Sequence, residues 1–438
     1  MKILKIILTI LMVIPNCLAQ EEIQFPPHKT VIAIPFQLVN NLVVIPLKIN
    51  GAELNFLLDT GVEETILFSL EDQKEIDFYN VEKIRLRGLG SQGGTEGLRS
   101  TKNTISFAGL KFKNEEVLIV LDQDMDFASS LGIPVNGIIG YHFFRDNLVK
   151  INYERKKIYI YNRDKVTAKD ITKKFTEFPI TIEKNKPYIQ TTVLIDEEPI
   201  PAKLLVDTGN SDAIWLFHSK SEKLKIPKKN LDEFLGRGFS GEIFGKKARI
   251  RHFSINDFKF KNPIVSFPDT SSIRNVKMVE NRLGSVGGEL FKRFIIIFDY
   301  RNHKLYARKN GSFNLPFNYN KSGIELHHAG LRYVKEKVLD KDEGVVNVDL
   351  GENNYDLKYR FELKPSYEIA SIRKDSPAEK IGLMKGDVLI SINRSYCHYH
   401  TLQDINNILR SDEGKVLEIE IERDNVPMKF KLKLQNLL

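Results

Sequence analysis

Two short stretches govern the fold of this chain: LLDTG at residues 57–61 and LLVDTG at residues 204–209. Each places an aspartate directly after an apolar run and follows it with a threonine and a glycine. The apolar run favours a buried strand, and the glycine permits a tight turn at its end. We therefore expect Asp59 and Asp207 to lie on loops at the rim of a hydrophobic core.

The surroundings of the two aspartates recur in the same order along the chain. Asp207 follows Asp59 by 148 residues. Two further pairs of stretches keep nearly this spacing: GLGSQG (88–93) with GRGFSG (236–241), 148 residues apart, and GIIG (137–140) with GSVG (284–287), 147 residues apart. Three landmarks at almost one spacing indicate a duplication into two lobes.

The first glycine stretch also fits the G-x-G-x-x-G spacing of dinucleotide-binding loops. Such a loop needs a helix after it, because the N–H groups at the helix start hold the phosphates. The residues that follow, GTEGLRS at 94–100, contain another glycine and no apolar face at helical spacing. The sequence favours flexible backbone in a repeated lobe over a phosphate site, and we expect no cofactor.

The amino terminus is typical of an exported protein. Residues 1–19 combine lysines, an apolar run and a small final residue, which predicts a signal peptide cleaved after Ala19 and a secreted or periplasmic protein. Cys17 could instead be a lipid-attachment site, but Pro15-Asn16 suits that motif poorly. A membrane partner is expected only if Cys17 is lipidated, because no later apolar run approaches the roughly 18 residues of a membrane helix.

Composition excludes several classes of protein. The formal net charge of +8 falls to +6 when Lys2 and Lys5 leave with the signal, and the basic residues are scattered among acidic ones. This pattern indicates a solvated surface, and we expect no nucleic-acid partner. Cys397 would be the only cysteine after cleavage, so no intrachain disulfide is expected. His327-His328 and the CHYH stretch at 397–400 lack zinc-site spacing, so we expect no metal.

Secondary structure is expected to be mainly β. Runs rich in β-branched residues, such as 31–51 and 188–209, alternate with turn residues in both lobes. Within the two lobes, short helices are predicted after the GIIG and GSVG stretches, at 141–146 and 289–294.

The paired aspartates suggest a specific chemistry. A single Asp-Thr-Gly could be only a turn in which the aspartate caps backbone N–H groups. Two equivalent copies that pack about a pseudo-twofold axis would bring Asp59 and Asp207 together, where they must share one proton. The ionised member could then activate water while the protonated member polarises a peptide carbonyl.

These residues resemble the retropepsin-like aspartic proteases. The similarity lies in LLDTGVEETIL (57–67), in LLVDTGNSDAIWL (204–216) and in GIIG (137–140), and it extends over most of Phe25 to Lys309; GSVG departs from the family pattern at Ser285. The resemblance implies catalytic roles for Asp59 and Asp207, with Thr60 and Thr208 bonded across the lobe interface and Gly61 and Gly209 permitting the turns. It also implies that the glycine stretches are flaps that close over substrate, through Gly88, Gly90, Gly93, Gly236, Gly238 and Gly241.

The chain after Pro316 resembles a bacterial PDZ domain. The similarity rests on Ser376-Pro377-Ala378, Gly382-Leu383 and Gly386-Asp387. PDZ grooves bind a peptide as an added strand. The resemblance implies a groove edge at Gly323, Ile324, Glu325 and Leu326 and a groove helix at 401–409 with Ile405 and Leu409. A long insertion at 335–366 separates the two parts.

Taken together, the sequence predicts a signal peptide (1–19), lobe 1 (20–168), lobe 2 (169–315) and a PDZ domain (316–438) that forms a β-sandwich or barrel with one or two helices. The two lobes would form a pseudo-dimer that acts as an exported aspartic endopeptidase. Its expected partners are a peptide or protein substrate and a peptide or C-terminus bound by the PDZ domain. Two alternatives remain open: a catalytically inactive peptide-binding adaptor, and a protease active only as an intermolecular dimer.

Overall fold

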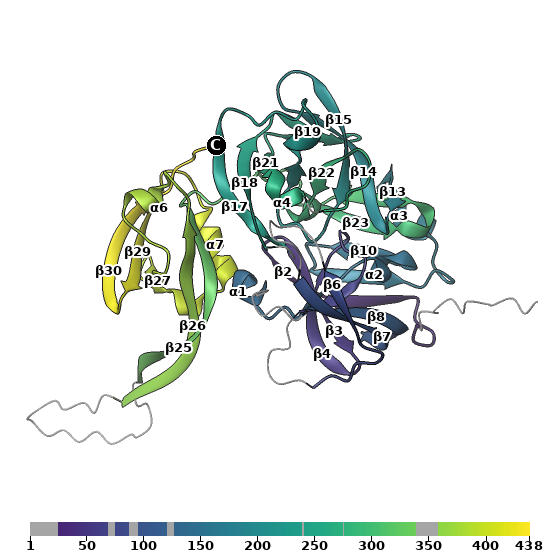
Figure 1. Ribbon diagram of the computed structural model, residues 1–438, viewed down its shortest axis with the longest axis horizontal. Helices are drawn as coiled ribbons and strands as arrows, with labels where there is room; N and C mark the ends of the chain where they lie inside the picture. Colours follow the sequence, from purple (N-terminus) through teal and green to yellow (C-terminus); the bar gives the residue numbers. More distant parts are fainter. Residues whose placement is uncertain are drawn as a thin grey trace, which may run out of the picture.

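A computed structural model describes residues 25–68, 75–86, 95–120, 127–238, 241–274, 276–338 and 358–438. The protein is mainly β, and Figure 1 shows three bodies: two that lie against each other and a third, at the carboxyl end, beside them. We call the first two lobe 1 (β1 to β11) and lobe 2 (β12 to β24). No helix among the described residues has the length and apolar composition to cross a membrane. The predicted signal and Cys17 lie outside the described residues.

The main sheet of lobe 1 carries the first Asp-Thr-Gly loop. Strand β4 ends at Leu58, and β9 runs parallel to it with Leu57 opposite Ile138. The Asp59 N–H donates to Ile139 O at 3.0 Å, which ties the loop to the end of β9. The strand order is β2 (Gln37–Val39), β3 (Leu42–Ile49), β4 (Ala52–Leu58), β9 (Gly137–Ile139), β5 (Thr65–Leu67), β8 (Leu110–Val120), β7 (Thr95–Phe107) and β6 (Glu82–Leu86).

The main sheet of lobe 2 has the same pairing around the second loop. Strand β15 runs parallel to β22 with Leu205 opposite Ser285, and the Asp207 N–H donates to Val286 O at 2.9 Å. The strand order is β17 (Asn230–Gly238), β18 (Gly241–Arg249), β21 (Ile264–Pro268), β16 (Ile214–Leu216), β22 (Arg282–Val286), β15 (Pro199–Val206), β14 (Lys186–Leu194), β19 (His252–Ile255) and β20 (Phe258–Lys261), with β13 (Thr181–Glu183) paired to β14.

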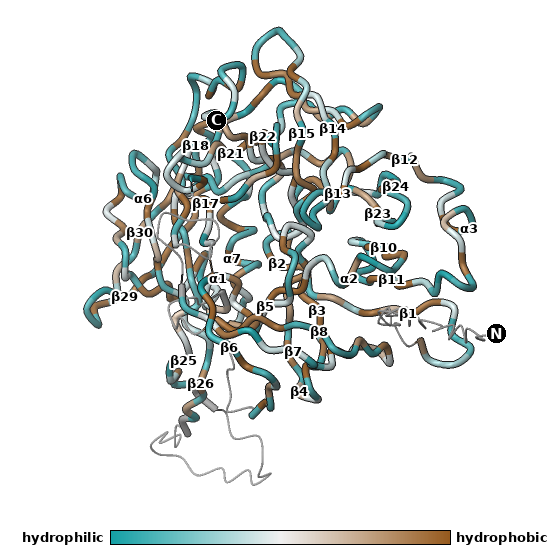
Figure 2. The backbone as a smooth tube through the Cα atoms, turned by 45° about the vertical axis from the view of Figure 1, so that its right-hand side comes forward, coloured by the Kyte–Doolittle hydropathy of each residue, from teal (hydrophilic) through white to brown (hydrophobic). Residues whose placement is uncertain are grey.

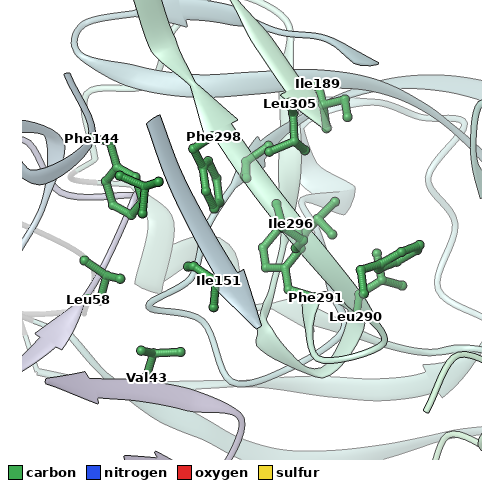
Figure 3. Packing of buried hydrophobic residues seen from close by; sticks show 14 of the residues in the cluster. Val43, Leu58, Phe144, Ile151, Ile189, Leu290, Phe291, Ile296, Phe298 and Leu305 are labelled. Carbon is green, nitrogen blue, oxygen red and sulfur yellow. The ribbon is translucent and has the colours of Figure 1, made fainter. Parts of the chain in front are cut away.

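A third sheet joins the two lobes. Its central pair is β10 of lobe 1 and β23 of lobe 2, which run antiparallel with Lys150 opposite Ile297. The order is β1 (Val31–Pro35), β11 (Lys157–Tyr161), β10 (Leu148–Asn152), β23 (Phe294–Asp299), β24 (Lys304–Lys309) and β12 (Thr176–Pro179). One hydrophobic core runs through both lobes across this sheet, as Figure 3 shows for side chains from Val43 to Leu305. The lobes are therefore held together by shared β structure and a common core.

The two short helices fall where the sequence predicts them. Helix α2 (Tyr141–Arg145) follows Gly140, and α5 (Gly288–Phe291) follows Gly287. Gly140 is required here, because a β-carbon at this position would lie 2.1 Å from Val62 O. The remaining short helices of the lobes are α1 (Phe127–Leu131), α3 (Ala168–Thr172) and α4 (Thr270–Ile273).

The carboxyl-terminal body is a β-sheet with a separate core. Its strands are β25 (Ile324–Val338), β26 (Lys358–Ile372), β27 (Val388–Ile392), β29 (Val416–Arg423) and β30 (Val426–Lys433) in sheet order, with β28 (Ser395–Tyr396) paired to β27. Helix α6 (Pro377–Lys380) begins after Ser376, whose hydroxyl accepts from Glu379 N–H at 3.3 Å. Helix α7 (Leu402–Leu409) begins with a capping box formed by Thr401 and Asp404.

The described residues of the predicted insertion at 335–366 belong to strands β25 and β26. They extend β25 and β26 into a two-stranded arm that projects from the body (Figure 1).

Figure 2 shows hydrophobic and hydrophilic residues alternating along many strands, which is the pattern of sheets with one buried face.

Candidate active site

The structure brings Asp59 and Asp207 together at the interface of the lobes. Their side chains share a hydrogen bond. The Gly61 N–H donates to Asp59 Oδ1 at 2.7 Å. A β-carbon at Gly61 would lie 3.0 Å from a carboxylate oxygen of each aspartate, and one at Gly209 would lie 2.2 Å from Asp59 Oδ2. Both glycines therefore give the carboxylates room to approach the backbone of the opposite loop.

The two threonines hold the loops together by reciprocal hydrogen bonds. The Thr60 N–H donates to Thr208 Oγ1 and the Thr208 N–H donates to Thr60 Oγ1, both at 3.0 Å. Each hydroxyl also donates to a carbonyl of the other lobe: Thr60 to Val206 O at 2.6 Å and Thr208 to Leu58 O at 2.8 Å. Both side chains are buried, so these four bonds fix the distance between the loops without competition from water.

Burial raises the pKa of both carboxyl groups, but their surroundings differ. The Gly61 and Gly209 N–H groups and the charge of Lys186 all favour the ionised form of Asp59 and so oppose the increase. The negative charge of Asp59 raises the pKa of Asp207 further, although Arg282 and Lys186 act in the opposite direction. The arrangement favours one shared proton that resides mainly on Asp207, with the charge on Asp59.

Two hairpin turns reach across the interface to the residues that follow each Asp-Thr-Gly loop. Asn41 Nδ2 donates to Ser211 O at 2.9 Å, and Asn185 Nδ2 donates to Glu63 Oε1 at 2.6 Å. Ser211 and Glu63 are again 148 residues apart. Asn41 and Asn185 have φ of 68° and 57°, in the left-handed region that asparagine tolerates. Both turns are two residues long, Asn40-Asn41 and Lys184-Asn185. Sequence reasoning did not identify them, because Asn41 and Asn185 are 144 residues apart and so depart from the 148-residue spacing of the repeat.

A buried polar pair explains why GSVG departs from the GIIG pattern. Asn210 Nδ2 donates to Ser285 Oγ at 3.1 Å, and both side chains are buried. The equivalent positions in lobe 1 are Val62 and Ile138, which pack in an apolar cluster. Serine at 285 is therefore matched to asparagine at 210. The amide of Asn210 donates to this hydroxyl rather than to the carboxylate of Asp59 or Asp207.

This pairing predicts a non-additive stability effect. Asn210→Val and Ser285→Ile should each lower the free energy of unfolding by about 1–3 kcal/mol, because each leaves a buried polar group without its partner. The double variant restores the apolar pair of lobe 1 and should lose clearly less than the sum of the two. Urea denaturation of the four proteins measures this coupling. Strict additivity would contradict the matched pair.

The glycines predicted to form flaps lie partly within the described residues. Gly236, Gly238 and Gly241 belong to the β17–β18 hairpin, in which Gly238 pairs with Gly241 next to the turn. Gly236 and Gly241 have φ of 142° and 101°, which side chains rarely adopt. Gly88, Gly90 and Gly93 lie outside the described residues.

The predicted PDZ groove faces lobe 1. Helix α1 lies against β25 and close to α7 (Figure 1). A β-carbon at Gly132 would lie 2.7 Å from Leu402 Cβ, and the Asn40 N–H donates to Gln403 Oε1 at 2.5 Å. Four of the remaining predicted groove residues are buried in the core of this body: Ile324, Leu326, Ile405 and Leu409. Gly323 has φ of 85° before β25. Glu325 is half-buried, and the charges of Glu233 and Lys247 in lobe 2 act on its carboxyl group.

We also examined the side chains of metal-ligating type for a possible metal site. In the described part of the chain, no group of three or more His, Cys, Asp and Glu side chains is arranged to hold a metal ion. Cys397 is buried, and burial raises the pKa of its thiol to about 12.

Comparison with protein families agrees with the two parts of this description. Residues 45–143 match the aspartyl protease family, and residues 368–423 match the PDZ domain family. The chain thus contains an aspartyl protease domain followed by a carboxyl-terminal PDZ domain. The matched protease segment includes Asp59 and the GIIG stretch but ends before lobe 2. No curated protein matches the chain.

Proposed function

We propose that this protein is an exported aspartic endopeptidase. Substrate peptide bonds would be hydrolysed at a site formed by the carboxyl groups of Asp59 and Asp207. The observation that carries the proposal is the pair itself: two carboxyl groups share a hydrogen bond at the lobe interface, and Thr60 and Thr208 lock their loops reciprocally. Export rests on the amino-terminal sequence alone. The PDZ domain would contribute recognition of peptide or protein substrates.

The unequal surroundings of the two carboxyl groups suggest their roles. Ionised Asp59 would accept a proton from the attacking water, because the Gly61 and Gly209 N–H groups support its charge. Protonated Asp207 would donate a hydrogen bond to the scissile carbonyl and so polarise it. Attack of water transfers one proton from water to Asp59 and the proton of Asp207 to the carbonyl oxygen, which gives a tetrahedral gem-diol intermediate. On collapse the C–N bond breaks, one hydroxyl of the gem-diol returns its proton to Asp207, and the proton that Asp59 accepted passes to the leaving amine.

The direct test is incubation of the purified mature chain with a diverse peptide library, with and without pepstatin, with products identified by mass spectrometry. Cleavage at internal peptide bonds that pepstatin inhibits supports the proposal. An adaptor would bind peptides and leave them intact. The complete pair within one chain favours a monomeric protease over an intermolecular dimer, because β10 and β23 already occupy each other's edges.

The residue after the first Asp-Thr-Gly predicts the pH dependence of activity. Val62 has no hydroxyl to donate to a catalytic carboxylate, and the amide of Asn210 is bonded to Ser285. Burial raises the pKa of both aspartates, so the ionised state forms at higher pH than in a pair supported by hydroxyl donors. We expect a bell-shaped profile of kcat/KM with an optimum less acidic than is typical of pepsins.

Val62→Ser adds a donor that stabilises the charged form, so its acidic limb should move to lower pH. Profiles of wild type and Val62→Ser on one short peptide measure the effect, and Val62→Ala controls for the change in size. The prediction is wrong if the acidic limb of the Val62→Ser profile stays where it is in wild type, or if the optimum of wild type is as acidic as that of pepsins.

A further inference from the structure

The PDZ domain contacts lobe 2 through a buried ion pair at the predicted flap. Arg373, which follows β26, donates through Nη1 to Glu233 Oε2 at 2.8 Å. Glu233 lies in β17, the first strand of the β17–β18 hairpin. The Arg373 and Glu233 side chains are only 3% and 14% exposed. A pair this well shielded is coupled far more strongly than a surface pair.

The contact continues from the hairpin into the loop that carries Asp207. Lys247 of β18 stands opposite Leu231, so it shares a face of the hairpin with Glu233. Its Nζ lies 3.3 Å from Asp212 Oδ1, and Asp212 is five residues after the catalytic Asp207. The charges of Asp212, Glu233 and Glu325 all act on Lys247. Lobe 2 and the PDZ strand β25 therefore meet at one cluster of charges.

Asp212 is itself held firmly. Its Oδ2 accepts from Trp215 Nε1 at 2.9 Å and from Ser266 Oγ at 2.7 Å, and its N–H donates to Asn210 Oδ1 at 2.9 Å. These bonds connect Asp212 to the catalytic loop on one side and to the strands beneath it on the other. Trp215 is the only tryptophan of the chain, so its fluorescence reports on this cluster.

We infer that Glu233 and Arg373 are positioning residues through which the PDZ domain sets the lobe 2 hairpin over the Asp207 loop. This inference rests on the proposed protease function. The PDZ domain is then part of the proteolytic unit rather than only a tether for substrate. Loss of the Glu233–Arg373 pair frees the base of the hairpin, and substrate binding weakens because the hairpin must be ordered each time.

The test uses the full mature chain and two neighbouring residues of β17. Glu233→Ala and the size-conserving Glu233→Gln remove the charge that faces the PDZ domain. Asp232→Asn is the matched control, because Asp232 lies on the opposite face, is 80% exposed and pairs with Lys246. The measurements are KM and kcat on a peptide too short to reach the PDZ domain, the Trp215 emission spectrum, and urea unfolding to verify the fold.

We expect both Glu233 variants to raise KM at least about fivefold with a smaller change in kcat and to shift Trp215 emission, whereas Asp232→Asn changes neither. Arg373→Ala added to Glu233→Ala should have little further effect, as for two members of one pair. Glu233 variants that are folded and keep wild-type KM overturn the inference, whatever their emission. If the wild-type protein cleaves no peptide, the proposed protease function is wrong. In that case the fluorescence still tests the inference: unshifted Trp215 emission in both Glu233 variants would overturn the coupling between the Glu233–Arg373 pair and the Asp212 cluster.

Discussion

Asp59→Asn and Asp207→Asn should each lower kcat/KM for peptide cleavage by about 10³-fold or more. Asparagine keeps the shape of the side chain but can neither accept the proton of water nor donate an acidic one. The double variant should be no less active than either single variant, because groups that act as a unit lose their contribution once. The measurement is single-substrate kinetics on a short peptide. Wild-type turnover in Asp207→Asn would indicate an Asp59 homodimer instead.

The stability of Asp207→Asn at two pH values shows whether a loss of activity reflects a loss of folding. Burial raises the pKa of Asp207 above its ordinary value of 3.8, so the folded state binds the proton more tightly than the unfolded chain. The contribution of this group to stability is therefore lost as the pH rises from about 4 through the raised pKa. Asp207→Asn removes this loss. We expect it to be at least as stable as wild type at neutral pH and to gain less at pH 4, as thermal unfolding at the two pH values would show.

Thr208→Val should be the most damaging change outside the dyad. Valine has nearly the shape of threonine but leaves the buried Thr60 N–H and Leu58 carbonyl without the partners that now lie at 3.0 and 2.8 Å. Two buried groups lose their hydrogen bonds, which corresponds to about 2–4 kcal/mol in the free energy of unfolding. We also expect kcat/KM to fall by at least about tenfold, because the two loops are no longer held at a fixed separation.

Thr208→Ser is the matched control for this prediction, since it keeps the hydroxyl and removes one methyl group. Its loss should stay near 1 kcal/mol. Urea denaturation and kinetics on one short peptide compare the two variants. Equal stability of the valine and serine variants would show that the reciprocal bonds do not hold the lobes together.

Much of the local structure follows from the sequence. The apolar runs that end at Leu58 and Val206 predict the strands β4 and β15, because β-branched and leucine-rich runs bounded by a turn fit a buried strand. Thr401, with Asp404 three residues later, marks the start of α7. The outer strands of the arm were not predicted. Apolar residues such as Tyr333 and Phe361 are exposed in the arm. An alternation of buried apolar and exposed polar residues, which marks a strand in the sequence, is therefore absent from this part of the arm.

The sequence by itself determined that two equivalent aspartates stand on equivalent loops, since the spacing of 148 residues can be read directly. Only the tertiary structure decided that the loops meet and which of their neighbours become partners. The Asn210–Ser285 bond joins residues 75 positions apart, and the Glu233–Arg373 pair joins residues 140 apart. Local patterns of polarity and turn residues cannot encode such contacts, because they arise only when separate sheets pack and exclude water between them.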